Sequence, residues 1–489
     1  MPSALSSLVE EARLVAQAIK DFGAHLVSPT LRLGVTGLSR AGKTVFITAL
    51  VHGLTRGGRF PVFESLATGR VAGARLAPQP DDAVPRFDYE AHLHALVDER
   101  RWPQSTIDVS ELRLAIDFQR ASGAERTLTL DIVDYPGEWL LDLPLLEKTY
   151  EQWSRESLAL SREGPRARLA SEWHALLATL RPLDVANEQD ALAAARLFTA
   201  YLKACRDERF ALSLLPPGRF LLPGAMAGTP ALTFAPLDVT EDGEAPPNSL
   251  WAMMRRRFEA YQDLIVRPFF RDHFARLDRQ VVLVDALSAF NAGPDALHDL
   301  EAAMGDILEC FRVGRRTLLS SLVRPRIDRI LFAATKADHL HQLSHDRLEA
   351  ILKHMVREQT ARAGSAGALT DAIAIASVRS TREAEVRRGR DRLPAIVGTP
   401  VEGERSAGDT FDGATEIATF PGDLPADAEP LFNGRANFQG LSVATADQAD
   451  FRFLRFRPPA LACASGEPPA LPHIRLDRAL QFLIGDKLA

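Results

Sequence analysis

The chain is poor in cysteine and contains no long apolar run. Its three cysteines, Cys205, Cys310 and Cys463, lie far apart and have no metal-type spacing. This usage argues against a disulfide framework and is typical of reduced thiols in the cytosol. No stretch approaches the ~18 to 20 unbroken apolar residues that a membrane-spanning helix needs. We therefore expect a cytoplasmic protein without a transmembrane segment, whose membrane association, if any, is peripheral at the inner membrane.

An excess of basic residues is also missing, because the net charge is −6. Nucleic-acid binding usually needs a concentrated basic surface, so no nucleic acid is expected as a partner. With 489 residues the chain is too long for one ordinary core, which suggests several domains or one domain with large insertions. Within residues 3–20, Glu10 and Glu11 stand beside the apolar residues Leu8, Leu14, Val15 and Ile19. The segment 1–30 is therefore predicted to form an N-terminal amphipathic helix rather than a secretory signal.

Residues 37–44 read Gly-Leu-Ser-Arg-Ala-Gly-Lys-Thr and match the phosphate-loop pattern G-x-x-x-x-G-K-[ST]. They follow an apolar run that resembles a strand and precede a segment that resembles a helix, which is the context that the pattern requires. Backbone N–H groups of such a loop bind phosphates, Lys43 adds a positive charge, and the Thr44 hydroxyl is suited to Mg²⁺. The sequence thus predicts binding of a nucleoside triphosphate. The nucleotide-binding residues predicted here are Gly37, Ser39, Arg40, Ala41, Gly42, Lys43, Thr44 and Val45.

Two alternating runs, residues 111–118 and 126–133, predict a β-hairpin. The second run ends at Asp134, and Gly137 follows three residues later. At a strand end downstream of a phosphate loop, this spacing predicts that Asp134 supports Mg²⁺ through water and that the Gly137 N–H contacts the γ-phosphate. Residues 53–98, rich in glycine and proline, predict a loop with one short helix.

Helical periodicity dominates residues 140–278, which we interpret as a helical insertion. Strand patterns resume at residues 280–286 and 327–334, and the first of these has continuous β-branched residues without alternation, as expected for a strand buried on both faces. The nucleotide-binding core is therefore predicted to comprise residues 31–139 and 279–400. The remaining predicted units are a loop excursion at residues 401–450 and a C-terminal strand and helix, within residues 451–489, that complete the core.

Thr335, Lys336 and Asp338 follow the strand predicted at residues 327–334. An aspartate carboxylate can accept hydrogen bonds from N1–H and the exocyclic amine of guanine, whereas adenine has an acceptor at N1 and no amine at position 2. The aliphatic stem of Lys336 is long enough to lie along the base plane. These residues predict recognition of guanine.

The order of these motifs resembles the signature of the Ras-like GTPases. More closely, the chain is similar to the bacterial YcjX-type proteins in four segments. They are Trp-Pro-Gln-Ser-Thr at 102–106, Asp-Tyr-Pro-Gly-Glu-Trp at 134–139, Leu-Pro-Ala-Ile-Val-Gly-Thr-Pro at 393–400, and Phe-Arg-Phe-Leu-Arg-Phe-Arg-Pro at 451–458. The resemblance implies an α/β fold of the P-loop NTPase (Ras-like) type, with a mostly parallel sheet and a large inserted helical domain.

The same resemblance implies a GTPase that uses Mg²⁺ to convert GTP into GDP and phosphate, acting as a stress-related switch in the phage-shock setting. It implies that Ser377, Val378 and Arg379 contact the base, at the position where Ras-like proteins usually carry Ser-Ala-Lys. It does not name a partner, for which we expect a protein effector or activator associated with the membrane.

The predicted catalytic residues are Lys43, Thr106, Gly137 and Glu138, and the predicted metal site comprises Thr44, Thr106 and Asp134. Thr106 is the candidate for the mobile threonine that closes on Mg²⁺. Glu138 stands where Ras-like proteins carry a water-orienting glutamine, and its charge would be strained beside a triphosphate. Transition-state cations could come from Arg40, Arg100 or Arg101.

Two other hypotheses remain open from the sequence. The chain could be a nucleotide-gated interaction module with negligible hydrolysis, because Glu138 replaces the glutamine and the helical insertion begins directly after it. A single-turnover hydrolysis assay separates this module from an enzyme. The chain could also be a P-loop ATPase, in which case Asp338→Asn would leave the nucleotide preference unchanged.

Overall fold

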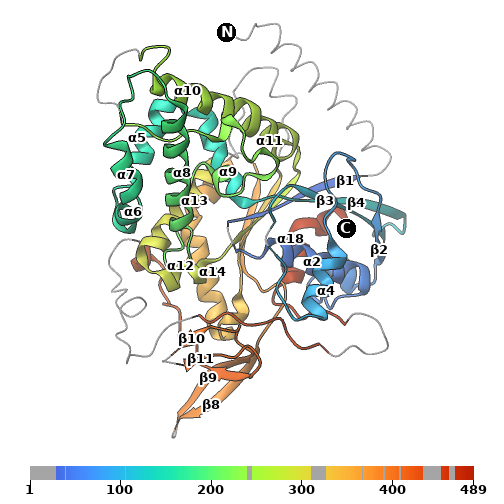
Figure 1. Cartoon of the computed structure of the whole chain (residues 1–489). Helices are drawn as coiled ribbons and strands as arrows, with labels where there is room; N and C mark the ends of the chain where they lie inside the picture. The colour runs from blue at the N-terminus through green and yellow to red at the C-terminus, as the bar shows by residue number, and fades with distance from the viewer. Residues whose placement is uncertain are drawn as a thin grey trace.

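A seven-stranded sheet forms the centre of the computed structural model (Figure 1). The model describes residues 29–38, 40–104, 106–238, 245–309, 327–365, 367–388, 391–406, 409–432, 453–461 and 469–489. The strands are β1 Thr30–Gly37, β2 Val71–Ala77, β3 Ser110–Gln119, β4 Glu125–Asp134, β5 Arg279–Val284, β6 Arg329–Ala334 and β7 Leu369–Ala374. Their order in the sheet is β2-β3-β4-β1-β5-β6-β7. The N-terminal helix predicted within residues 1–30 lies outside the described residues, apart from residues 29 and 30.

Five strands, β4, β1, β5, β6 and β7, run parallel to one another, and β2 and β3 add an antiparallel edge. All six residues of β5 are buried, as the continuous β-branched run in it predicted. The mostly parallel α/β fold is confirmed. The edge strand β2 was not foreseen, because only Val71 of its seven residues is buried and its alanines and glycine give no strand signal.

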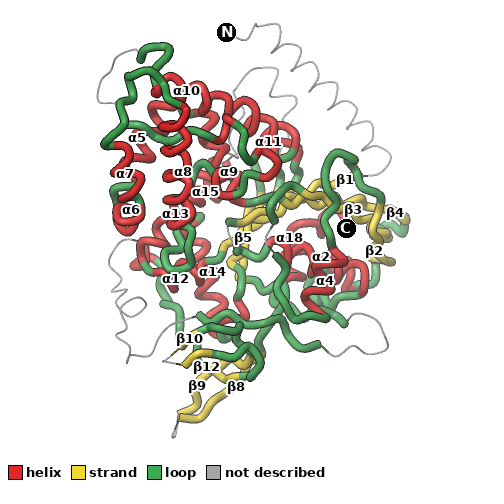
Figure 2. The backbone as a smooth tube through the Cα atoms, viewed as in Figure 1, coloured by secondary structure: helices red, strands yellow, loops and turns green. Residues whose placement is uncertain are grey.

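Helices cover both faces of the sheet, so the core has two layers (Figures 1 and 2). Val281 and Leu283 of β5 face one layer, which contains α2 Lys43–Arg56, α4 Tyr89–Val97 and α18 Leu476–Ile484. Val282 and Val284 face the other layer, with α12 Ala286–Ala292, α13 Pro294–Glu309 and α14 His345–Met355. Alternate residues of one strand thus serve opposite layers. Shorter helices are α3 Glu64–Ala67 and α15 Arg357–Ser365.

The helical part between β4 and β5 packs against the second of these layers. Its elements are η1 Gly137–Glu147, α5 Tyr150–Leu160, α6 Gly164–Leu169, α7 Ser171–Leu177, α8 Glu188–Cys205, α9 Gly218–Leu221, η2 Gly224–Met226, η3 Pro230–Leu232, α10 Leu250–Tyr261, the π-helical η4 Gln262–Val266, α11 Arg267–Asp272 and η5 Phe274–Arg276. Aromatic rings fill its interior, with Trp153 stacked on Phe258 at 5.1 Å and Trp173 on Tyr201 at 5.5 Å. The same apolar cluster continues into Phe332 of the sheet. The insertion is therefore not separated from the sheet by a polar boundary.

A small antiparallel sheet, β8 Arg382–Arg388, β9 Asp391–Gly398 and β12 Ile417–Thr419, projects at the bottom of Figure 2. β10 Arg405–Ser406 pairs with β11 Asp409–Thr410, and α16 Glu429–Phe432 follows. Part of the segment predicted as a loop excursion, 401–450, thus contains short strands. These were missed because strands of two or three residues carry no period. Residues 433–450 lie outside the described residues.

The C-terminal strand predicted within residues 451–489 is not formed in its described part. Residues 453–461 contain one isolated bridge, between Phe456 and Pro400. Pro458 and Pro459 follow, and proline has no N–H with which to continue a ladder. The predicted C-terminal helix is α18, and the buried Arg279 of β5 binds Asp486 just beyond it at 2.5 Å. No helix in the described ranges is long and apolar enough to cross a membrane.

Candidate nucleotide site

The phosphate loop lies between β1 and α2 in the conformation that its glycines permit. Gly42 has φ 84° and Arg40 has φ 63°, both in the left-handed region that favours glycine. Among the described residues no side chain caps α2, so its first-turn N–H groups are available to an anion. Lys43 donates from Nζ to the Gly37 carbonyl at 2.9 Å, which holds the ammonium over the loop. Ala41 is buried beneath the loop and Val45 is half-buried on α2, whereas Ser39 lies outside the described residues.

Three predicted metal residues converge at the ends of the neighbouring strands β1 and β4. The Thr106 hydroxyl donates to Asp134 Oδ2 at 2.6 Å, and Thr44 Oγ1 lies 3.3 Å from Thr106 Oγ1. Asp134 is buried, and its Oδ1 has no hydrogen-bond partner among the described residues. Burial raises the pKa of Asp134 to about 6, although the positive charge of Lys43 and the hydrogen bond from Thr106 oppose the shift.

This donor set fits Mg²⁺. Two hydroxyls and a carboxylate supply oxygen ligands, which this cation prefers, and the buried, unpartnered Asp134 Oδ1 is a group that a cation or its water would satisfy. A bound Mg²⁺ would neutralise negative charge on the phosphates. Thr44, Thr106 and Asp134 would hold it.

Two close backbone approaches connect the phosphate loop to the helical insertion. A Cβ on Gly137 would lie 1.9 Å from the Gly37 carbonyl oxygen, and a Cβ on Gly218 would lie 1.8 Å from that of Glu138. Both values are far below van der Waals contact, so each glycine is required by space rather than by φ. The backbone at Gly137 and Glu138 is therefore packed between the phosphate loop and α9.

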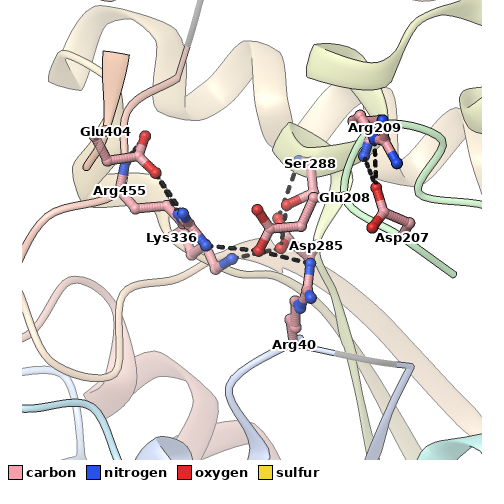
Figure 3. Close-up of polar contacts among 9 residues, drawn as sticks. All are labelled: Arg40, Asp207, Glu208, Arg209, Asp285, Ser288, Lys336, Glu404 and Arg455. Atoms are coloured by element: carbon pink, nitrogen blue, oxygen red, sulfur yellow. Dashed lines mark hydrogen bonds and ion pairs between the residues drawn. The ribbon is translucent and has the colours of Figure 1, made fainter. Parts of the chain in front are cut away.

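Glu138 is buried and its carboxylate is 3.4 Å from Arg206, which follows α8 of the insertion. Arg40 pairs with Glu208 at 2.7 Å, and Arg455 binds the same carboxylate at 2.6 Å (Figure 3). These pairs place the insertion and the C-terminal segment beside the phosphate loop. Sequence reasoning missed them, because a polar turn after a helix carries no motif.

The two other predicted cations face elsewhere. Arg100 donates from Nε to the Pro458 carbonyl at 3.2 Å, and Arg101 pairs with Glu99 at 2.7 Å. Nothing in this geometry brings either guanidinium to the phosphate loop. Arg40 is the only one of the three that belongs to the loop itself.

The predicted base-reading residues lie at the end of β6. Lys336, at φ 61°, places its Nζ 2.5 Å from Asp285 Oδ2, while the Thr335 hydroxyl is 3.4 Å from the Val284 carbonyl. Asp285 is buried at the end of β5. Burial would raise its pKa, but the charge of Lys336 and the hydrogen bonds from Lys336 and Ser288 outweigh burial and lower it. Asp285 therefore stays ionised and holds the ammonium of Lys336.

Asp338 is buried and accepts two hydrogen bonds from Ser380, one from its N–H at 2.8 Å and one from its hydroxyl at 2.5 Å. Both bonds reach Oδ2 and fix the carboxylate. Ser380 was not predicted, although the hydroxyl pair at residues 380 and 381 was the signal available. The predicted Ser377, Val378 and Arg379 lie just beyond β7, and the Arg379 side chain binds the Thr381 carbonyl at 2.9 Å.

Comparison with known proteins gives this arrangement its context. The model of the YcjX-like family, DUF463, matches residues 31–488. The chain belongs to the YcjX-like family. A relative named "Ras-like GTPase YcjX" from Escherichia coli (strain K12) is 39% identical over 474 residues, covering 94% of this chain and 96% of the relative. A second protein of that name, from Shewanella oneidensis, is 34% identical over 488 residues and covers 94% of each chain.

The family predicted from the four sequence segments is thus confirmed, and the YcjX-like match runs from β1 to the C-terminal end of the described chain. It includes both the phosphate loop and the helical insertion. The relatives' names place them among the Ras-like GTPases, a class of GTP-hydrolysing enzymes, and the order of strands and site elements here agrees with that class.

Proposed function

We propose that this protein binds GTP and GDP with Mg²⁺ and hydrolyses GTP to GDP and phosphate. The observation that carries the proposal is the convergence of Lys43, Thr44, Thr106 and Asp134 at the ends of β1 and β4. In open α/β sheets, ligands bind outside the carboxyl ends of the strands. The relatives' names, which describe GTPases, support the same activity.

Each residue has one task in this proposal. Lys43 and the first-turn N–H groups of α2 bind the outer phosphates, while Thr44, Thr106 and Asp134 hold Mg²⁺. Gly137 contributes its N–H to the γ-phosphate, and Glu138 orients the attacking water. The remaining nucleotide contacts come from the phosphate loop and from residues at the ends of β6 and β7.

Guanine selectivity is assigned to Asp338, supported by the position of Lys336. The two bonds from Ser380 hold the Asp338 carboxylate in one orientation, and Asp285 restrains Lys336. A fixed acceptor recognises the N1–H and amine of guanine and leaves adenine without a matching donor at N1. Ser377 and Val378 would contribute backbone N–H groups at the far edge of the base, whereas the Arg379 N–H donates to the Pro472 carbonyl at 2.7 Å.

The proposal extends to a cellular role. Residues 31–139 and 279–400 act as the nucleotide-binding core, and residues 140–278 contact a protein effector or activator at the inner membrane. The packing of Glu138 against Gly218 supports this extension, because it joins the insertion to the residue after the γ-phosphate sensor. The family resemblance supports a stress-related switch.

Equilibrium binding of fluorescent GDP and ADP, with Mg²⁺, tests base recognition in the wild type and in Asp338→Asn. We expect guanine-selective binding that is lost in the variant. Equal or adenine-favouring binding would refute guanine recognition and leave a P-loop ATPase.

Hydrolysis is tested separately by multiple-turnover release of phosphate from GTP, with Lys43→Ala as the inactive control. We expect turnover by the wild type that depends on Lys43 and Mg²⁺. Tight GTP binding with no cleavage above the Lys43→Ala background would contradict the enzyme and favour a nucleotide-gated interaction module.

A further inference from the structure

A four-residue turn of the helical insertion reaches the nucleotide site. Residues 206–209, Arg-Asp-Glu-Arg, follow directly after α8 and are here called the α8 turn. Two of its side chains form ion pairs with residues near the nucleotide site: Arg206 pairs with Glu138, and Glu208 pairs with Arg40 of the phosphate loop. The α8 turn therefore contacts both the loop that would hold the phosphates and the residue after the γ-phosphate sensor.

Arg206 is the one hydrogen-bonding or ion-pair partner that the described residues give to the Glu138 side chain. The distance between Arg206 Nη1 and Glu138 Oε1 is 3.4 Å, and the Glu138 side chain is 6% exposed. A carboxylate withdrawn from water needs an opposite charge or hydrogen-bond donors. Arg206, which is 33% exposed, supplies both. Removing it would leave Glu138 buried and unpaired.

The α8 turn is held in place by a chain of ion pairs that Figure 3 shows. Glu208 lies between Arg40 at 2.7 Å and Arg455 at 2.6 Å, and Arg455 continues to Glu404 at 2.6 Å. Each exposed pair contributes little alone, but a network in which two arginines bind one carboxylate restricts its position. The phosphate loop and the segment 453–461 thus both hold the turn through Oε1 of Glu208.

The backbone of Glu138 is restrained as well. Gly137 lies against the Gly37 carbonyl, and the Glu138 carbonyl lies against Gly218. Close contacts on both sides prevent the residue from moving away from the phosphate loop without moving α9. With the backbone held in this way, the ion pair with Arg206 orients the Glu138 side chain.

We propose that Arg206 is a positioning residue for GTP hydrolysis, which holds the Glu138 carboxylate where it orients the attacking water. This inference rests on the proposed function. In the reaction, the water oxygen forms a bond to the γ-phosphorus while the bond to the β–γ bridging oxygen breaks. GDP leaves with that electron pair, and the proton of the water ends on the released phosphate. Glu138 accepts a hydrogen bond from the water, and Arg206 offsets the repulsion between this carboxylate and the phosphates.

The insertion would then complete the hydrolytic centre. A neutral side chain at this position would be repelled less by the phosphates than a carboxylate is. The pairing with Arg206 is what allows the Glu138 carboxylate to orient water there. A displacement of the α8 turn by a partner would change the rate of hydrolysis without touching the nucleotide.

The test compares steady-state GTP hydrolysis by the full-length wild type, Arg206→Gln, Arg206→Lys and Arg209→Gln. Arg209 belongs to the same turn, is 82% exposed and pairs with Asp207 inside the turn, so it is a matched control. We expect Arg206→Gln to lower kcat by roughly 10- to 100-fold with little change in KM, because a water-positioning effect acts on the chemical step. Arg206→Lys should recover part of kcat, and Arg209→Gln should retain the wild-type rate.

A double-mutant cycle with Glu138→Gln measures whether the effects of the two substitutions on kcat are coupled. A purely structural role of Arg206 would not produce such coupling. If Arg206 acts through Glu138, Arg206→Gln should have little further effect once Glu138 is replaced. Thermal midpoints and GDP affinities of all variants, measured alongside, identify a loss that comes from misfolding. If Arg206→Gln misfolds, Arg206→Lys, which keeps the charge, is used to decide whether Arg206 positions Glu138.

The outcomes separate this inference from the function beneath it. If the wild type shows no Lys43-dependent GTP hydrolysis, the proposed function fails and this inference fails with it. If the wild type hydrolyses GTP and Arg206→Gln keeps or raises kcat, the inference alone is refuted. Equal losses in Arg206→Gln and Arg209→Gln, or a loss confined to KM, would also refute it.

Discussion

Replacing Gly218 by alanine tests whether the insertion is fixed to the nucleotide site by a backbone contact. The added Cβ would lie 1.8 Å from the Glu138 carbonyl oxygen and 2.4 Å from its carbonyl carbon. Because both neighbouring atoms are backbone, no rotamer change can relieve the overlap. The segments at Gly218 and Glu138 must move apart by more than about 1 Å to restore van der Waals contact.

Two costs combine in this variant. Overpacking in a closed interior typically costs about 1–3 kcal/mol. The displacement also stretches the hydrogen bond from the Gly218 N–H to Asp142 Oδ1, which is 2.6 Å long and buried, and an unsatisfied buried group costs about 1–3 kcal/mol. We therefore expect Gly218→Ala to lower the free energy of unfolding by roughly 2–6 kcal/mol.

The assay is urea denaturation followed by tryptophan fluorescence, since Trp139 and Trp153 are buried on this side of the sheet. Gly364→Ala is the matched control, because a Cβ at Gly364 of α15 has no neighbour within 4 Å and alanine favours helix. The control should match or slightly exceed the wild type in its midpoint. A Gly218→Ala midpoint indistinguishable from the control would refute the argument that this contact is closed.

Three further predictions concern single side chains of the site and the insertion. Thr106→Ala removes the hydroxyl that binds Asp134 at 2.6 Å and faces Thr44, so we expect the affinity for GTP with Mg²⁺ to fall by roughly 10-fold or more while GDP binding changes little. Titration with fluorescent GTP and GDP analogues measures both affinities. An equal loss for the two nucleotides would contradict a γ-phosphate-linked role. Ser380→Ala removes one of two bonds to Asp338 and should weaken GDP binding by roughly 5- to 10-fold, which corresponds to the usual value of one hydrogen bond, whereas unchanged affinity would show that the backbone bond alone fixes the carboxylate. Burial raises the pKa of Asp142 to about 7, against the opposing effects of Tyr261, Gly218 and Arg219, so the folded carboxyl keeps its proton up to a pH at which the unfolded one has lost it. The wild type should therefore lose roughly 3 kcal/mol of stability relative to Asp142→Asn as the pH rises from about 4 to about 7, measured by urea denaturation across that range. A difference that stays constant with pH would contradict the assignment.

The sequence predicted those parts of the fold whose local pattern and long-range role agree. The phosphate loop is such a case, because the glycines, Lys43 and Thr44 are required by one short stretch of backbone. The buried strand β5 is another, because its continuous run of β-branched and apolar residues suits a strand that is covered on both faces. The roles of the individual site residues stay predictions until nucleotide binding is measured.

What the sequence could not predict depends on contacts between distant segments. Arg206 and Glu138 are 68 residues apart, and Arg455 and Glu208 are 247 residues apart. Neither pair leaves a periodic or motif-like signal in one chain. The edge strand β2 and the extended segment 453–461 were misjudged for a related reason, because pairing with a neighbour rather than local propensity decides their conformation.

The order of close contacts suggests how a nucleotide signal would travel. Gly37 of the phosphate loop meets Gly137, and Glu138 meets Gly218, with backbone atoms on both sides of each contact. Flexible side chains could absorb a small shift at such an interface, but two directly apposed backbones cannot. A movement at Gly137 must therefore displace α9, whose Gly218 is hydrogen-bonded to Asp142 of η1, and η1 itself begins at Gly137. The turn after α8 is held separately by Arg40 and Arg455. If α9 is displaced while that turn stays in place, the distance between Arg206 and Glu138 would change first. On this reasoning the pair is the contact most sensitive to the state of the phosphate loop, and a partner bound to the insertion would act on hydrolysis through it.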